Sequence, residues 1–380
     1  MMRFISFFKF YFSPNRIYGL DILRALAIML VTIFHSGYIL HYNNYQQLFL
    51  LDGLDGVSLF FVLSGFLIGG VLVRILEKDG VAFKTLLNFW IRRWLRTLPA
   101  YFFVLSTLLI LSILLTPHFS LRDAYKFYLF LQNFNYRQPK FFPESWSLSI
   151  EEWFYLLVPL IIILIIKFFR LSIKTAILAT TIAIIVFAVT FRFCRFLNTP
   201  TYTLDSWIYM FRNQVTTRLD SLMLGVLGAY CSQYHKSFFS KNKFILLFAG
   251  VLILLMQTAC DLFHLVGFGL YQCVFSFTVT AIGGVFLLPF LSELRTGSGF
   301  IYKIITYISI VSYSLYLLSD YFLRCFMLKY IDYHSLSRFL PASSMFIQYL
   351  LYWVYVFIGA HILYKCIEKP FMDFRKNIRI

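Results

Sequence analysis

The amino-acid sequence predicts an all-α fold, a polytopic bundle of about ten transmembrane helices. Of its 380 residues, 60% are hydrophobic and only 13% are charged, whereas a soluble domain is about half apolar and a quarter charged. Apolar runs long enough to cross a bilayer core, which takes about 20 residues, recur along the whole length. A transmembrane β-barrel would instead show weak alternation in segments of about ten residues.

Ten apolar segments account for the predicted spans, and they form a single membrane domain over residues 18–371. In chain order they are 18–40, 54–76, 97–116, 147–167, 174–192, 217–232, 243–261, 266–292, 303–326 and 344–366. The segment 217–232 is short for a span and is expected to gain residues from a flank. Residues 1–17 are basic and aromatic, which predicts a cytoplasmic or interfacial segment that lies on the membrane or stays disordered. Residues 372–380 are predicted to form a basic cytoplasmic tail.

The lysine and arginine residues predict the orientation of the bundle. If the N-terminus is cytoplasmic, 22 of them fall in cytoplasmic segments and ten, including Arg192, fall in outer segments. Multi-pass proteins carry their excess of positive residues in cytoplasmic loops, so we expect both termini to be cytoplasmic. Arg24 and Arg218 remain, within or at the edge of spans.

The formal net charge of +17 has a plain explanation in a membrane protein. In a soluble protein such a charge would indicate nucleic-acid binding. Here the same residues mark cytoplasmic loops and contact anionic lipid, so the lipid bilayer is an expected partner and nucleic acid is not. The spacing of the cysteines indicates neither a metal site nor a disulfide framework, and no bound cofactor is expected.

Three ionisable residues share one stripe of the first span, in the stretch RIYGLDILRALAIMLVTIFH (16–35). Successive helix residues turn by about 100°, which places Asp21, Arg24 and His35 on the same side. Asp21 and Arg24 could pair, and His35 lies about 16 Å further along the axis. Because charges in a bilayer are costly, this stripe favours a protein interior or a water-filled cavity. The structural alternative is an ion pair at the helix start and a hydrogen-bonded histidine.

The stretch FWIRRWLRTLPAYFF (89–103) places two arginines on one helix face. Arg93 and Arg96 precede Pro99, a residue that suits the first turn of a helix. Two guanidinium groups at a cytoplasmic helix start could clamp phosphate groups. The alternative is ordinary anchoring of a cytoplasmic loop by side chains that reach the membrane surface.

The stretch ESWSLSIEEWFYLLVPL (144–160) begins a span with two carboxylates. Ser149 and Glu152 fit a capping box, which would be a sufficient account of Glu152. Glu151 has no such explanation, and Tyr155 follows it by four residues on the same side. A carboxylate and a phenol at the outer end of a bundle could bind sugar hydroxyls or hold a catalytic histidine.

Small residues gather in the stretch GVSLFFVLSGFLIGG (56–70). Ser58, Ser64, Gly65, Gly69 and Gly70 give one face of the helix a low profile. Such a face favours close packing against another helix in the membrane.

In their order and spacing, these stretches resemble the acyltransferase 3 family of integral-membrane acyltransferases. The resemblance covers nearly the whole chain and also rests on RLDSLMLGVLGA (218–229), SYSLYLLS (312–319) and IEKPF (367–371). It implies transfer of an acyl group, commonly acetyl, from acyl-CoA to a hydroxyl, usually of a glycan such as lipopolysaccharide O-antigen or exopolysaccharide. The chain departs from the family at Ser58, where an acidic residue is frequent, and at Ser319, where a histidine is frequent and this chain continues with Asp320.

On this resemblance, His35 would be the general base on the acceptor hydroxyl, since neutral imidazole accepts a proton near pH 7. A covalent acyl-His35 intermediate also fits. Glu151 would orient His35 or bind the acceptor, and Arg24 would line the donor path or stabilise the developing oxyanion. Acyl-CoA would be bound by Arg93, Arg96 and Tyr101. The supporting or acceptor-side residues would be Asp21, Ser58, Glu152 and Tyr155.

The expected protein is therefore a multi-pass O-acyltransferase of a bacterial inner membrane, acting on acyl-CoA and a surface glycan or glycolipid. Two other classes stay open. A transporter or flippase of an anionic or lipid-linked substrate would use similar residues, although the sequence shows no repeated halves. A scaffold of a glycan-assembly complex would leave His35 replaceable.

Overall fold

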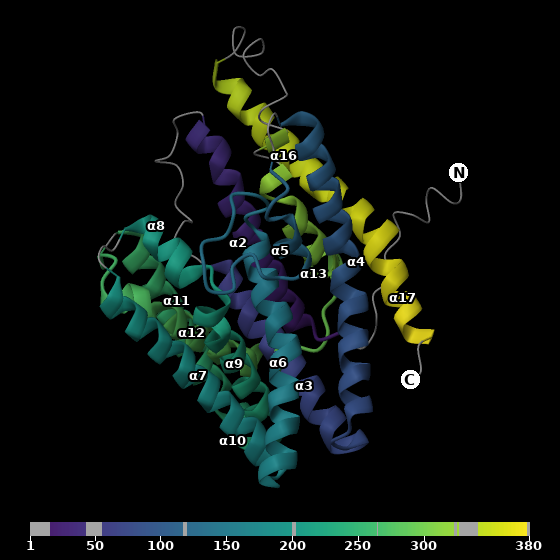
Figure 1. Ribbon diagram of the computed structural model, residues 1–380, viewed down its shortest axis with the longest axis vertical. Helices are drawn as coiled ribbons and strands as arrows, with labels where there is room; N and C mark the ends of the chain where they lie inside the picture. The colour runs from purple at the N-terminus through teal and green to yellow at the C-terminus, as the bar shows by residue number, and fades with distance from the viewer. Residues whose placement is uncertain are drawn as a thin grey trace.

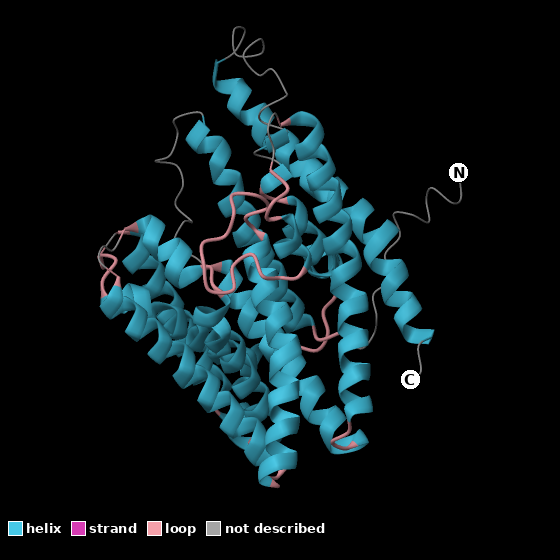
Figure 2. Ribbon diagram, in the orientation of Figure 1, coloured by secondary structure: helices cyan, strands magenta, loops and turns pink. Residues whose placement is uncertain are grey.

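The structure, a computed structural model, describes residues 16–42, 55–116, 120–199, 203–263, 265–322, 325–326 and 341–377. Within these ranges every regular element is a helix, and nine helices are long and apolar enough to cross a membrane. The predicted all-α, multi-pass fold is confirmed, as Figures 1 and 2 show. The predicted interfacial segment at the N-terminus lies outside the described residues except for its last two.

The long helices follow one another up and down the bundle (Figure 1). They are α2 (Tyr18–Tyr42), α3 (Gly56–Asp79), α4 (Phe83–Leu115), α6 (Ser145–Phe169), α7 (Ile173–Asn198), α9 (Val215–Tyr234), α11 (Lys243–Leu262), α12 (Ser276–Glu293), α13 (Gly299–Leu318) and α16 (Pro341–Leu363). The short elements are α5 (Ala124–Tyr128), α8 (Leu204–Ser206), η2 (Trp207–Arg212), α10 (Lys236–Lys241), η3 (Tyr271–Phe275), η5 (Tyr364–Glu368) and α17 (Lys369–Asn377). The π-helical turn η3 leads directly into α12, and α16 continues through η5 into α17.

The sixth predicted span, 217–232, is a helix of a different kind from the other nine. It gains residues at both ends, as expected, and forms α9 (Val215–Tyr234). Its polar side chains, among them Arg218 and Asp220, give it too little hydropathy to count as a span by composition. Most of its residues are buried, because α3, α7 and α12 surround it. This helix is stabilised by its protein neighbours and contacts little lipid.

The helix that carries the paired arginines begins earlier than the sequence predicted. α4 starts at Phe83, so Pro99 lies in its interior rather than in its first turn. Proline inside a helix removes one main-chain hydrogen bond, but neighbouring helices in a membrane protein can compensate. Arg93 and Arg96 therefore lie within the bundle and not in the loop before it.

Two further predictions at helix ends are wrong. α6 starts at Ser145, so Ser149 is inside the helix and no capping box forms. Its hydroxyl instead donates to the main-chain oxygen of Phe130, at 2.7 Å. Arg192, which the charge count assigned to an outer segment, lies inside α7 and is fully buried. A prediction from hydropathy ends the span at a buried arginine, because it cannot detect a carboxylate partner on another helix.

The small residues of α3 pack closely against another helix, as predicted, and the structure shows that this helix is α9. A Cβ atom added at Gly65 would lie 1.9 Å from the main-chain oxygen of Leu222. A Cβ atom added at Gly225 of α9 would lie 2.2 Å from the main-chain oxygen of Val62. Gly70 does not take part, since its nearest neighbour would be a side chain at 3.8 Å. The two helices therefore pack backbone to backbone, which fixes the part of α3 that faces the interior.

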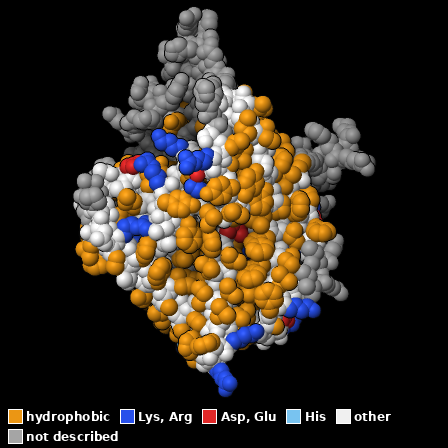
Figure 3. Space-filling model, viewed as in Figure 1, with side chains coloured by type: hydrophobic (Ala, Val, Ile, Leu, Met, Phe, Trp, Pro, Cys, Tyr) orange, Lys and Arg blue, Asp and Glu red, His pale blue; other side chains and the backbone are white. Residues whose placement is uncertain are grey.

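The bundle has two ends, and its surface agrees with a membrane position. At one end, the main-chain nitrogen of Gly19 donates to the main-chain oxygen of Leu294, which joins the start of α2 to the end of α12. We call this the Arg16 end, and the opposite end, where α3 begins, the Asp55 end. Figure 3 shows hydrophobic side chains over the middle of one face, with lysines and arginines above and below them.

Candidate active site

A cavity of about 450 Å³ lies between α2, α3, α4, α6 and α13, with α17 at one end. Along α3 its lining runs from Val57 to Ile75, which is about 27 Å at 1.5 Å per residue. A bilayer core is about 30 Å thick, so this one cavity covers most of the distance across it.

The lining of this cavity is strongly basic. Six arginines line it: Arg24, Arg74, Arg92, Arg93, Arg96 and Arg375. Among the lining residues that the structure describes, Glu151 carries the only carboxylate. Arg74 and Arg92 are exposed, and the main-chain oxygen of Arg92 accepts a hydrogen bond from Arg375. The arginines therefore form a mouth at the Arg16 end, and the deeper members of the set lead inward from it.

Glu151, Tyr155 and Arg93 form a hydrogen-bonded chain across the cavity wall. The Tyr155 hydroxyl donates to Glu151 Oε2 at 2.7 Å and accepts from Arg93 Nη2 at 2.8 Å. Ser64 Oγ lies 2.6 Å from the same hydroxyl, whose only proton is already used, so Ser64 is the donor there. The predicted pairing of Glu151 with Tyr155 on one helix side is confirmed, and its further partner is an arginine rather than a histidine.

Arg24 and Arg96 line the same cavity in a different way. Neither makes a hydrogen bond or ion pair with another residue in the described part of the chain. The carboxylate of Glu368 acts on Arg96 electrostatically. It forms no ion pair with Arg96 and accepts a hydrogen bond from Ser314 Oγ at 2.9 Å. Two guanidinium groups that form no ion pair with the described residues, in the interior of a bundle, are suited to an anionic ligand.

Asp21 has a partner other than the predicted one. Its carboxylate pairs with Arg16, whose Nε lies 2.8 Å from Oδ2, and accepts from Ser309 Oγ at 2.7 Å. Arg24 turns instead toward the cavity. Asp21 therefore ties the start of α2 to α13 and leaves Arg24 available to the cavity.

His35 lies just beyond the far end of the cavity. Its Nδ1 is 2.7 Å from Ser319 Oγ, and its ring centroid is 6.4 Å from that of Tyr316. Tyr316 and Ser147 both line the cavity, and their hydroxyls are 2.6 Å apart. The three predicted residues of the α2 stripe thus lie at three levels: Asp21 at the Arg16 end, Arg24 in the cavity and His35 beside its far end.

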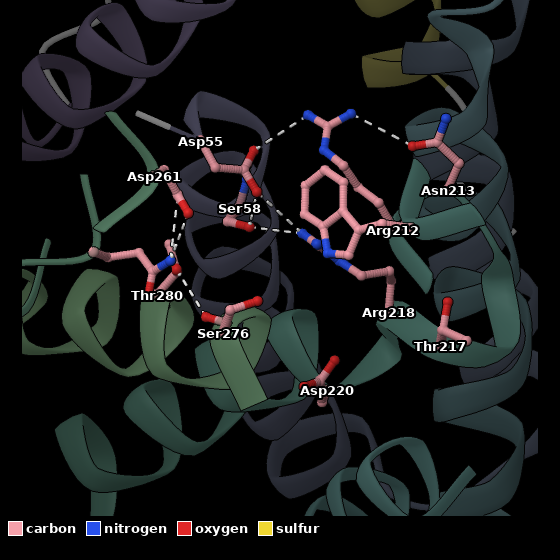
Figure 4. A network of polar contacts seen from close by, with 12 residues as sticks. Asp55, Ser58, Arg212, Asn213, Thr217, Arg218, Asp220, Asp261, Ser276 and Thr280 are labelled. Atoms are coloured by element: carbon pink, nitrogen blue, oxygen red, sulfur yellow. Dashed lines mark hydrogen bonds and ion pairs between the residues drawn. The ribbon is translucent and has the colours of Figure 1, made fainter. Parts of the chain in front are cut away.

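Ser58 belongs to a separate polar network at the Asp55 end, which Figure 4 shows. Its hydroxyl donates to Asp55 Oδ2 at 2.5 Å and accepts from Arg218 Nη2 at 2.6 Å. Arg212 lies 3.7 Å from the other oxygen of Asp55 and 4.9 Å from the ring centre of Trp146. Asp55 precedes the span, and burial by itself would raise the pKa of its carboxyl. The charges of Arg212 and Arg218, with hydrogen bonds from Ser58, lower this pKa overall.

Tyr101 and Glu152, like Asp21, His35, Ser58 and Tyr155, are predicted residues that do not line the cavity. Tyr101 is buried, donates to the main-chain oxygen of Phe127 at 2.9 Å and stacks on Phe130 at 4.8 Å between ring centroids. It fastens α5 to α4 and lies apart from Arg93 and Arg96, the predicted donor-binding arginines. Glu152 accepts from Thr97 at 2.8 Å and joins α6 to α4.

Three arginines of the cavity, Arg74, Arg92 and Arg375, are not predicted as site residues by the sequence. They lie on three different helices, α3, α4 and α17, so no local spacing connects them. Ser319 was noted as a departure from the family, and its contact with His35 needs the folded structure.

Comparison with known proteins gives one family and several relatives. A family model described as an acyltransferase domain matches residues 17–365. The O-acetyltransferase OatA of Staphylococcus aureus (strain NCTC 8325 / PS 47) is 34% identical over 172 residues, which are 42% of this chain and 27% of that protein. Another relative, SACOL0978 of Staphylococcus aureus (strain COL), is 31% identical over 236 residues, which are 59% of this chain and 36% of that protein. The matches thus span about a third or less of these relatives' length. No solved structure matches the chain.

Proposed function

Because the chain belongs to the acyltransferase 3 family of integral-membrane acyltransferases, we propose that it is a membrane O-acyltransferase, with acetyl as the group transferred. The donor is acyl-CoA, and the acceptor is a hydroxyl of a surface glycan such as lipopolysaccharide O-antigen or exopolysaccharide. The observation that carries the proposal is the continuous cavity that leads from the arginine mouth almost to His35.

The arginines suit a donor that carries phosphate groups on a long arm. Guanidinium groups bind phosphate oxygens in a bidentate geometry. Arg92, Arg93 and Arg96 would bind the phosphates. The arm of the donor would extend inward along the apolar residues of α3 that line the cavity. The thioester would then lie toward the far end of the cavity, near Tyr316 and Ser147. A donor with this shape explains why the charged part and the deep part of one cavity differ in chemistry.

His35 would supply the proton transfer at the far end. The acceptor oxygen attacks the thioester carbonyl, its proton passes to His35, the new C–O bond forms and the C–S bond breaks. The proton can then leave with the CoA sulfur as a thiol, so no other reagent is needed. Glu151 keeps Arg93 and Tyr155 in place and acts on the donor side of this reaction.

The orientation follows from the position of the donor. Acyl-CoA is a cytoplasmic metabolite, so the Arg16 end would face the cytoplasm of a bacterial inner membrane. The chain ends described here, Arg16 in front of α2 and Arg375 in α17, both lie at that end. The acceptor would approach from the Asp55 end.

The test compares wild type with His35→Gln in lipid nanodiscs, supplied with acetyl-CoA and a glycan acceptor. We expect the release of CoA thiol that accompanies acetylation of the glycan to fall about 10²–10⁴-fold, as for loss of a general base. His235→Gln changes an exposed histidine at the junction of α9 and α10 and is the matched control. Full activity of His35→Gln would overturn the role of His35, and an absence of CoA release in wild type would favour a transporter.

The same proteins give the orientation when they are reconstituted into sealed vesicles. Acetyl-CoA should support glycan acetylation only when it is supplied at the face that carries Arg92. Acetylation driven from the opposite face would contradict the proposed position of the donor.

A further inference from the structure

The end of α13 meets His35 through Ser319, the first residue after that helix. Ser319 Oγ lies 2.7 Å from His35 Nδ1 and 3.1 Å from the main-chain oxygen of Tyr316. The Ser319 side chain is fully buried, and it does not line the cavity. It therefore acts on a ligand of the cavity only through His35.

The proton of the Ser319 hydroxyl can be assigned by counting donors. A main-chain oxygen can only accept, so a contact of 3.1 Å between Ser319 Oγ and the Tyr316 oxygen needs the serine proton between them. The carbonyl of Tyr316 lies in the last turn of α13, where it accepts from the main-chain nitrogen of Ser319 at 3.4 Å, and its second lone pair accepts the serine proton. With its proton used there, Ser319 Oγ can only accept from His35, and Nδ1 must carry the hydrogen.

The surrounding contacts fix the position of His35 relative to Ser319. The hydroxyl of Tyr352, on α16, lies 3.1 Å from the main-chain oxygen of Thr32 and 3.0 Å from that of Ser319. One buried hydroxyl thus bridges α2, one turn before His35, and the end of α13. The geometry of the His35–Ser319 contact is therefore fixed by three helices.

We infer that Ser319 is a positioning residue, which holds His35 in the tautomer protonated at Nδ1 so that Nε2 presents its lone pair to the acceptor hydroxyl. This inference rests on the proposed function, since it assigns the nitrogen through which His35 acts as the base. The hydrogen bond also lets Nδ1–H stay bonded when Nε2 takes the proton, because both nitrogens of the imidazolium are donors. Ser319 thereby supports the charged state through which the reaction passes.

The direct test is the ¹⁵N spectrum of histidine-labelled protein in lipid, with His35→Gln used to identify the His35 signals. At a pH where the imidazole is neutral, we expect a protonated Nδ1 and a bare Nε2 in wild type. Ser319→Ala should give a mixture of both tautomers. A wild-type His35 protonated at Nε2 would overturn the inference, whatever the activity of the variants.

The kinetic test separates positioning from packing. Ser319→Ala should lower kcat about 10- to 100-fold, as loss of a histidine's hydrogen-bond partner does at metal sites, with little change in KM for the donor. Its activity should also fall off at a lower pH on the acidic side, because the imidazolium loses its acceptor. Ser319→Thr keeps the hydroxyl and should recover most of the rate. Ser276→Ala removes another buried serine hydroxyl, bonded to Gln272 of its own helical segment, and should leave kcat unchanged.

The outcomes distinguish this inference from the function on which it rests. Full activity in His35→Gln would remove the general base and, with it, the proposed mechanism. An inactive His35→Gln together with a fully active Ser319→Ala, with an unchanged pH profile, would overturn only the role of Ser319. If Ser319→Ala does not insert into the membrane, Ser319→Thr and the wild-type spectrum still decide the question.

Discussion

The arginines inside the bundle differ in whether the protein supplies partners for their guanidinium groups. Arg192 in α7 has an acceptor for each of its five N–H groups: both oxygens of Asp220, the main-chain oxygens of Val274 and Thr217, and Thr278 Oγ1. Arg24 and Arg96 line the cavity and have neither a hydrogen bond nor an ion pair among the described residues. A charge that is satisfied by the protein has a structural role, whereas an unsatisfied charge beside a cavity is available to a ligand.

The difference should first appear in stability. Asp220→Asn leaves the fully buried Arg192 without its counter-charge, and breaking a buried pair on one side costs about 3–5 kcal/mol. We expect the free energy of unfolding in mixed micelles to fall by that amount. Replacing both partners, with Arg192→Met and Asp220→Leu together, should recover much of the loss, because two apolar side chains leave no charge to desolvate. An unchanged stability of Asp220→Asn would contradict the comparison.

The cavity arginines should show the reverse behaviour. Arg96→Ala removes no hydrogen bond or ion pair between described residues and relieves repulsion from Arg93, so the free energy of unfolding should stay level or rise. Loss of a charge-assisted contact to phosphate costs about 1.5–3 kcal/mol, so KM for acyl-CoA should increase about ten- to hundredfold. Arg96→Lys should already weaken donor use, because lysine lacks the planar fork of arginine.

A surface arginine provides the control for this prediction. Arg137 is exposed and pairs with Asp205 at 3.1 Å, away from the cavity. Arg137→Ala should change neither KM nor stability measurably, as is usual for exposed pairs. If Arg96→Ala keeps normal donor dependence while it is correctly inserted, the cavity arginines only anchor the helices.

The sequence predicted the parts of the site that depend on spacing within one helix. The common side of Arg24 and His35, and the pairing of Glu151 with Tyr155, follow from helical geometry alone. The sequence could not predict contacts between helices. Asp220 lies 28 residues from Arg192 in the chain, and Ser319 lies 284 residues from His35.

Helix boundaries failed for a related reason. Hydropathy ends a span where charges begin, so it placed the start of the third span after Arg96 and the end of the fifth at Arg192. In the structure both arginines lie inside helices, because one faces a polar cavity and the other faces a carboxylate. A span boundary that hydropathy misplaces at an arginine therefore marks a charge inside the bundle that faces either a ligand cavity or a protein partner.

The network at the Asp55 end is intermediate between the fully bonded Arg192 and the unbonded cavity arginines. Its contribution to stability should depend on pH in the acidic range. Arg218 is fully buried and bonds Ser58, yet its Nε and Nη1 have no partner among the described residues. The lowered pKa of Asp55 means that its ion pairs add stability above its usual pKa. This stability should be lost as the pH falls through the lowered pKa of the folded state.

The expected effect is small, about 1 kcal/mol, because the Asp55 side chain is 22% exposed and its contacts with Arg212 and Arg218 are long, at 3.7 and 3.4 Å. Unfolding free energies of wild type and Asp55→Asn, measured from pH 7 down to pH 3, should differ at neutral pH and converge in acid. The neutral variant keeps the shape of the side chain and removes only its charge, so convergence isolates the ion pairs from the helix cap. Parallel curves over the whole range would show that Asp55 acts through hydrogen bonds alone. In that case the Asp55 end would resemble the closed network around Arg192, where the full set of hydrogen bonds holds the charge in place.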